Sequence, residues 1–141
     1  MKTPWHLWVV GGLSLIWHAG GAFDYLMSHL RPAFYLNMMP PGMVDYLDGY
    51  PLWATAAWAI GVWGAVLGSL LILLRSGLAV PVLWVSMVGL LVNTGHNMLI
   101  SDTNLEQITG RGAILFSLAI FVILALVLAY ASRQRSLGRL R

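Results

Sequence analysis

The chain has 141 residues, of which 59% are hydrophobic and only 9% are charged. Soluble domains carry about 25% charged residues, so this composition excludes an ordinary soluble domain and indicates an all-α integral membrane protein. The formal net charge is +3 and there is no cysteine, which excludes disulfides and thiolate metal sites. No basic groove with interleaved aromatic residues is present, so we expect a lipid bilayer and no nucleic acid as partner.

Four apolar stretches are long enough to cross a bilayer as helices, which takes about 20 residues. They cover residues 5–27, 52–74, 78–100 and 113–131. They predict a single membrane domain, residues 1–141, folded as a four-helix bundle. Only Arg75, Ser76 and Gly77 separate the second stretch from the third, which predicts a tight helical hairpin. The fourth stretch carries almost no polar group, so we expect much of its surface to face lipid.

The loop between the first two spans contains the segment PPGMVDYLDGYP. Its prolines and Gly49 are the start and stop signals of a short helix. Apolar and acidic side chains fall on opposite faces of that helix, with Met43, Val44 and Leu47 on one and Asp45 and Asp48 on the other. We therefore expect an interfacial helix over the outer mouth of the bundle.

The basic residues predict the orientation. Six of them lie at places that four spans bring to one side, namely Lys2, Arg75, Arg133, Arg135, Arg139 and Arg141. All five acids lie on or near the other side, together with two arginines: Asp24, Asp45, Asp48, Asp102 and Glu106, with Arg31 and Arg111. The positive-inside rule then predicts cytoplasmic termini and a cytoplasmic basic tail, residues 132–141. Lys2 and the following apolar run also fit a secretory signal, but helical and aromatic character through Tyr25 favours a retained span.

Polar residues form one stripe on the first span and another on the third. The stripes contain Ser14, His18, Tyr25 and His29, with Asp24 beside them, and Ser86, Gly89, Asn93, His96 and Asn97. An unsatisfied polar group in lipid costs several kcal/mol, so both stripes should face inward. We predict a polar pocket in the outer half of the bundle, lined by His18, Asp24, Tyr25, Asn93, His96 and Asn97.

Three interpretations of these residues stay open. They are structural contacts between helices, a ligand pocket, and a metal or haem site, for which His18, His29 and His96 are the candidates. No metal-binding motif supports the last interpretation, and no cofactor is predicted. No serine–histidine–acid set and no phosphate-binding glycine loop is present, so we predict no catalytic residue and no enzyme.

Small residues recur every four positions along the second span. They are Ala57, Gly61, Ala65 and Ser69, with Gly64 and Gly68 as a second pair. Such rows let two helices approach closely. The row predicts a close helix contact, either within the chain or with a second copy.

The stretches WHAGGAFDY, GYPLWATAAWAIGVWGAVLGSLLILLRS and AVPVLWVSMVG resemble a family of small four-span bacterial inner-membrane proteins. Its members are often labelled hypothetical or "sugar transporter". The resemblance covers the first three spans, and its Gly-Ala-x-Asp-Tyr element falls on residues 21–25. It implies a multi-pass protein of the bacterial inner membrane and adds weight to Asp24 and Tyr25. An asparagine is usual in the family at the position of His18, which argues against a metal there.

These observations give three hypotheses for function. The first is a small membrane protein whose outward-facing polar pocket binds or transports a small polar solute. Four spans would need at least a dimer to enclose a transport path. The alternative is an accessory subunit of a homo-oligomer or a larger membrane complex. The second alternative is a metal- or haem-binding membrane protein.

Overall fold

The computed structural model describes residues 3–101 and 105–141. Within these ranges the chain is helical and contains no strand. Three helices are long and apolar enough to cross a membrane: α4 (Leu52–Leu73), α5 (Ala79–Gly95) with its continuation η1 (His96–Ile100), and α7 (Arg111–Ser136). The protein is therefore an all-helical membrane protein. The fourth long helix is α1 (Trp5–Leu30), and the short helices are α2 (Ala33–Leu36), α3 (Met43–Asp48) and α6 (Leu105–Thr109).

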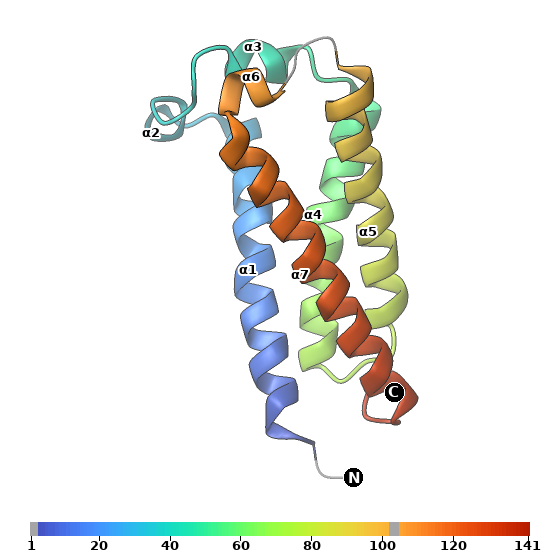
Figure 1. The fold of residues 1–141 in the computed structure, drawn as a ribbon. Coiled ribbons are helices and arrows are strands. Elements are labelled where there is room, and N and C mark those ends of the chain that lie inside the picture. The colour runs from blue at the N-terminus through green and yellow to red at the C-terminus, as the bar shows by residue number, and fades with distance from the viewer. Residues whose placement is uncertain (1–2, 102–104) are drawn as a thin grey trace.

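The long helices run beside one another, and the short helices gather at one end of the molecule (Figure 1). We call that end, with α2, α3 and α6, the loop end. The start of α1, the C-terminus and the α4–α5 turn lie at the opposite end (Figure 1), which we call the terminal end. Five of the six basic residues that we expect on one side of the membrane therefore lie together at the terminal end, namely Arg75, Arg133, Arg135, Arg139 and Arg141.

Prolines, and residues in the left-handed backbone conformation, mark the ends of the long helices. Pro4 and Pro51 precede α1 and α4 in extended conformation, where a proline loses no helical hydrogen bond. Arg31 ends α1 with φ +50° and donates its backbone N–H to the carbonyl of Met27 at 2.9 Å. Arg75 adopts φ +59° in the α4–α5 turn, so this turn reverses the chain within a few residues.

Helix α4 is central and packs most extensively against α5. A Cβ atom added to Gly61, Gly64 or Gly68 would lie 2.4–3.0 Å from side-chain atoms of α5. The contact is reciprocal, because a Cβ atom on Gly89 of α5 would lie 2.8 Å from the backbone of α4. The Ser86 hydroxyl also donates to the Gly61 carbonyl at 2.5 Å. The two backbones therefore lie almost in contact.

The opposite side of α4 packs against α1. A Cβ atom on Gly11 would lie 2.7 Å from the Leu73 side chain, and Ser69 is hydrogen-bonded to His18. Ala57 and Ala65 are buried. The small-residue row is thus an internal contact, divided between α5 and α1.

Helix α7 is the least enclosed of the four long helices. It crosses the others diagonally (Figure 1), and its largest interhelical contact is with α5. Only its second half is buried, through Leu124, Val127, Leu128 and Ala131. The structure therefore differs from an evenly packed bundle: α1, α4 and α5 form a layer, and α7 lies across it.

Several limits differ from the expected ones. The first span continues to Leu30, and α7 extends to Ser136 instead of ending at residue 131. The tail then folds back, since the Arg141 N–H donates to the Arg75 carbonyl at 2.9 Å and the Gly77 N–H to the Arg141 carbonyl at 2.7 Å. A short helix, α3, forms in the first loop and ends before Gly49 as expected. Lys2 and Asp102 lie outside the described residues.

The close approach of α4 and α5 makes a specific prediction for Gly89→Ala. The added methyl group meets backbone atoms of Ala57 and Gly61, which cannot rotate away, so the helices must separate. We expect a stability loss of about 1–3 kcal/mol, seen as a lower melting temperature in detergent. Gly20→Ala is the matched control, because nothing lies within 4 Å of its added Cβ. Equal melting temperatures for the two variants would contradict this contact.

Candidate functional site

The third apolar stretch changes its helical geometry where its polar residues lie. From His96 to Ile100 it forms a π-helix, in which the Ser101 N–H donates to the His96 carbonyl at 2.9 Å. Such turns insert one extra residue into a helix and are frequent at functional sites. Asn93 and His96 are buried and Asn97 is half-buried, so this stripe faces inward.

Two tyrosines from the first loop meet this stripe. The Tyr50 hydroxyl lies 2.5 Å from Asn93 Oδ1 and 2.6 Å from Asn97 Oδ1. The Tyr46 hydroxyl donates to Asn97 Oδ1 at 2.8 Å, and His96 Nδ1 lies 3.2 Å from the same oxygen. We call Tyr46, Tyr50, Asn93, His96 and Asn97 the tyrosine–asparagine cluster. It joins the first loop to α5 and η1 at the loop end.

The Tyr50 hydroxyl holds the central position of this cluster. A phenol has one proton, so it can donate to only one of the two amide oxygens at a time. The other amide, turned by 180°, would instead donate an N–H to the phenol oxygen. Burial, together with neighbouring Tyr46, raises the pKa of the Tyr50 hydroxyl above its usual value, so Tyr50 stays a neutral donor at ordinary pH.

Aromatic rings surround the cluster on the α4 side. The His96 ring lies edge-on to Tyr50, with centroids 4.8 Å apart, and to Trp53 at 5.1 Å. Trp58 lies 6.4 Å from Tyr50 and 5.0 Å from Tyr25 of α1. Tyr25 therefore reaches the cluster only through the ring of Trp58.

Asp24 lies apart from the cluster. Its carboxylate is exposed and accepts a hydrogen bond from the Tyr35 hydroxyl of α2. Burial, and then the Asp24 carboxylate, raise the pKa of Tyr35 to about 12. Asp24 thus connects α1 to the first loop, and Tyr35 is its partner.

His18 forms a third polar site, between α1 and α4. Only 5% of its surface is exposed, and its Nδ1 lies 2.8 Å from the Ser69 hydroxyl oxygen. Ser69 donates its own proton to the Ala65 carbonyl at 2.9 Å, so Nδ1 of His18 carries a hydrogen and donates to Ser69. Nε2 of His18 has no hydrogen-bond partner within the described part of the chain.

The six predicted pocket residues are therefore distributed over four places. Asn93, His96 and Asn97 come together, Tyr25 lies behind Trp58, and Asp24 and His18 have partners of their own. The three candidate metal ligands are also separate: His18 bonds to Ser69, His29 to the Tyr25 carbonyl at 2.7 Å and His96 to Asn97. In residues 3–101 and 105–141, no three histidine or acidic side chains are grouped to hold a metal ion.

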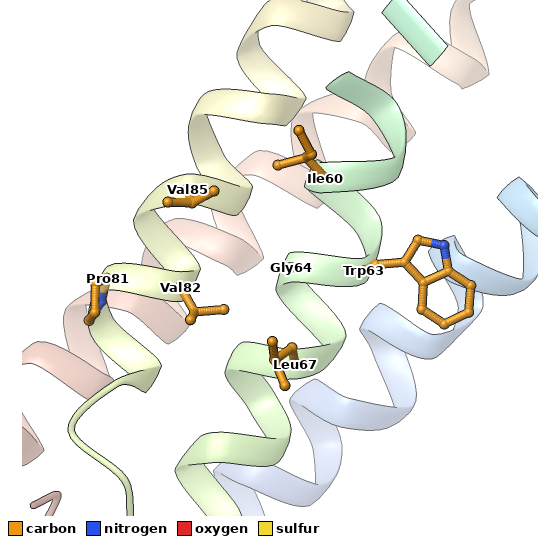
Figure 2. A pocket seen from close by; sticks show the side chains of 7 residues that line it. All are labelled: Ile60, Trp63, Gly64, Leu67, Pro81, Val82 and Val85. Atoms are coloured by element: carbon orange, nitrogen blue, oxygen red, sulfur yellow. The ribbon is translucent and has the colours of Figure 1, made fainter. Parts of the chain in front are cut away.

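A separate apolar groove lies between α4 and α5. Its volume is about 410 Å³. Figure 2 shows Ile60 and Leu67 of α4 on one side, Pro81, Val82 and Val85 of α5 on the other, and Gly64 between them. Trp63 lies at its edge and points away from α5 in this view. Gly64 contributes only backbone to the lining of this groove.

Sequence reasoning did not identify the residues that complete the site. These are Tyr35, Tyr46, Tyr50, Trp53 and Trp58. Their signal was present, since Tyr46 and Tyr50 are four positions apart in and after the short helix and so lie on one face. No comparable pattern in the sequence predicted the π-helix that begins at His96.

Comparison of the chain with protein-family models, with curated proteins and with solved structures found no match. The assignment of function therefore depends on the geometry alone.

The raised pKa of Tyr35 predicts a loss of stability at high pH. The folded chain holds this proton up to about pH 12, whereas the unfolded chain releases it near pH 10.0. The contribution is therefore complete below pH 10 and disappears as the pH rises toward 12. Absorbance at 295 nm should show a phenolate that titrates near pH 12 in the parent and is missing in Tyr35→Phe. A Tyr35 titration near pH 10 would contradict the contact with Asp24.

Proposed function

We propose that this chain is a multi-pass protein of the bacterial inner membrane with an outward-facing site for a small hydroxyl-bearing solute. The site consists of Asn93, His96 and Asn97, closed by Tyr50. The observation that carries this proposal is the position of the Tyr50 hydroxyl, 2.5–2.6 Å from two amide oxygens. The proposal assigns no catalytic residue and no cofactor.

The chemistry of the cluster supports a solute with hydroxyl groups. In the closed state one amide oxygen accepts the Tyr50 proton, so the same oxygen can accept a proton from an alcohol hydroxyl once Tyr50 moves away. The rings of Trp53 and Trp58 flank this position, and pockets that combine apolar walls with a few polar groups are typical of small-molecule sites. Tyr50 lies in the loop between α3 and α4, so we expect it to move more readily than the residues of the helices.

The proposed topology has four spans, because α1 crosses the membrane in addition to α4, α5 and α7. With 26 residues, α1 is about 39 Å long, enough for a hydrocarbon layer of about 30 Å. Its lower apolar content comes from inward-facing residues, because Ser14, His18 and Ser28 are buried. Its exposed face is apolar and includes Trp5, Trp8, Leu13, Ile16 and Phe23.

A second candidate function is that of a subunit in a homo-oligomer or a larger membrane assembly. The apolar groove between α4 and α5 favours it, because Ile60, Leu67 and Val85 leave an exposed apolar surface there for another helix (Figure 2). In that case the tyrosine–asparagine cluster serves only to fix the first loop. The two candidates differ in what removal of the Tyr50 hydroxyl does.

Tyr50→Phe tests the proposed site. Without the hydroxyl, a solute no longer competes with Tyr50 for the amides, so glycerol or glucose should bind several-fold more tightly. Asn97→Ala should abolish this binding. Binding is measured by calorimetry and by fluorescence of the flanking tryptophans in detergent-solubilised protein.

Solute binding, read together with the melting temperature, separates the two candidates. Interhelical hydrogen bonds in membranes average about 0.6 kcal/mol, so Tyr50→Phe should lower it only slightly. If Tyr50→Phe lowers the melting temperature and no solute of this class binds parent or variant, the solute site is refuted and the subunit is favoured. Ser132→Ala, in which a serine loses a bond within its own helix, is the control.

The proposed orientation has both termini in the cytoplasm. It is supported by the arginines of the terminal end and the acids near the loop end, which follow the positive-inside rule. A reporter that functions only in the cytoplasm should be active when it is fused after Arg141. Activity of a periplasm-dependent reporter, such as a phosphatase, at that position would reverse the orientation.

A further inference from the structure

Among the described residues, the arginines of the terminal end form no ion pair with an acidic side chain. The two ion pairs found in the described ranges, Arg31–Asp48 and Arg111–Glu106, both lie at the loop end. The described acids belong to the loop end or to the part of α1 next to it, namely Asp24, Asp45, Asp48 and Glu106. The positive charge of the terminal end is therefore not neutralised by these residues.

A cavity of about 520 Å³ lies within this positive region. Helix α1 contributes His6 to its lining, and α7 with the tail contributes the rest: Tyr130, Arg133, Gln134, Leu137 and Arg139. The lining contains two guanidinium groups and no carboxylate. Cavities of this size accept small ligands, and the charge of this one favours an anion.

The folded-back tail holds Arg139 in place. Gln134 is only 3% exposed and accepts a hydrogen bond from Arg139 Nη1 at 2.9 Å. The Arg139 backbone N–H also donates to the Gln134 carbonyl at 3.0 Å, and Leu140 is buried. A guanidinium has five N–H donors, so Arg139 keeps four of them for a ligand while its orientation is fixed.

The pair of His6 and Tyr130 adds another donor. His6 Nδ1 lies 2.6 Å from the Tyr130 hydroxyl. If Tyr130 donates, the histidine hydrogen is on Nε2, and if Nδ1 donates, the tyrosine hydrogen is free. A neutral pair therefore has one unused donor in either arrangement.

We propose that this cavity binds the phosphate of an anionic lipid headgroup. Arginines suit phosphate because their paired N–H groups match two of its oxygens. The rim suits a lipid, because Trp5, beside His6, is 75% exposed, and Leu137 is 45% exposed. Aromatic residues at this depth are typical of the membrane interface. This inference does not depend on the solute site at the loop end.

Native mass spectrometry of the full chain in detergent tests the proposal, with phosphatidylglycerol and phosphatidylcholine as probes. We expect phosphatidylglycerol to bind more tightly, and Arg133→Gln and Arg139→Gln each to weaken it about fivefold. The matched control is Arg135→Gln, which removes the same charge from the same helix outside the cavity and should change binding less than twofold. If Arg139→Gln changes the melting temperature in the absence of lipid, it has disturbed the fold. The lipid affinity of Arg133→Gln then tests the site.

Two outcomes would overturn the site. One is an equal loss for Arg135→Gln and the cavity variants, and the other is equal binding of the two lipids. Inorganic phosphate, added as a separate probe, distinguishes the source of the anion. If it raises the melting temperature as much as phosphatidylglycerol does at equal concentration, the lipid is overturned as the natural ligand. No effect of inorganic phosphate supports the lipid.

Discussion

The near-contact of two backbones, α4 and α5, is the constraint on which the other contacts depend. Gly61, Gly64 and Gly68 on one helix and Gly89 on the other remove the side chains that would separate them. Inside a bilayer, burial of apolar surface does not drive helices together, so van der Waals contact at short range has to. The Ser86–Gly61 hydrogen bond reinforces this contact without adding bulk.

The remaining elements are joined by single polar contacts at different heights. His18 and Ser69 connect α1 to α4, and His6 and Tyr130 connect α1 to α7 near the terminal end. The tyrosine–asparagine cluster connects the first loop to α5 at the other end. Each contact fixes the angle or register of an element that apolar packing alone would leave free to slide. Both proposed binding sites are built from polar groups that also fix the fold.

Much of the fold could be predicted from the sequence because membrane helices have strong signals. Apolar length indicated α4, α5 and α7, and proline and glycine signals indicated α3. The inward direction of Ser86, Asn93 and His96 followed from the cost of exposing them to lipid. The diagonal course of α7 could not be predicted, because its nearly uniform apolar surface does not favour one packing direction.

The candidate site was predicted less completely, and for a physical reason. Equal depth on two parallel helices placed Asp24 and Asn97 at similar heights, but depth does not determine which side chains meet. Asp24 found Tyr35, and Asn97 found Tyr46 and Tyr50, all from a loop whose path no periodicity describes. The π-helix from His96 to Ile100 is a further feature that no periodicity describes. Loops supplied the partners, and loop geometry was the missing information.

The short turn between α4 and α5 also bears on the order in which the chain assembles. Contacts between segments that are close in sequence form fastest, because little chain entropy is lost in closing them. The two helices with the most intimate contact are also neighbours along the chain, so we expect this hairpin to associate first after insertion. Helix α7, synthesised last and least enclosed, would then dock on a finished surface. Amide hydrogen exchange that was slower in α7 than in α4 would contradict this order.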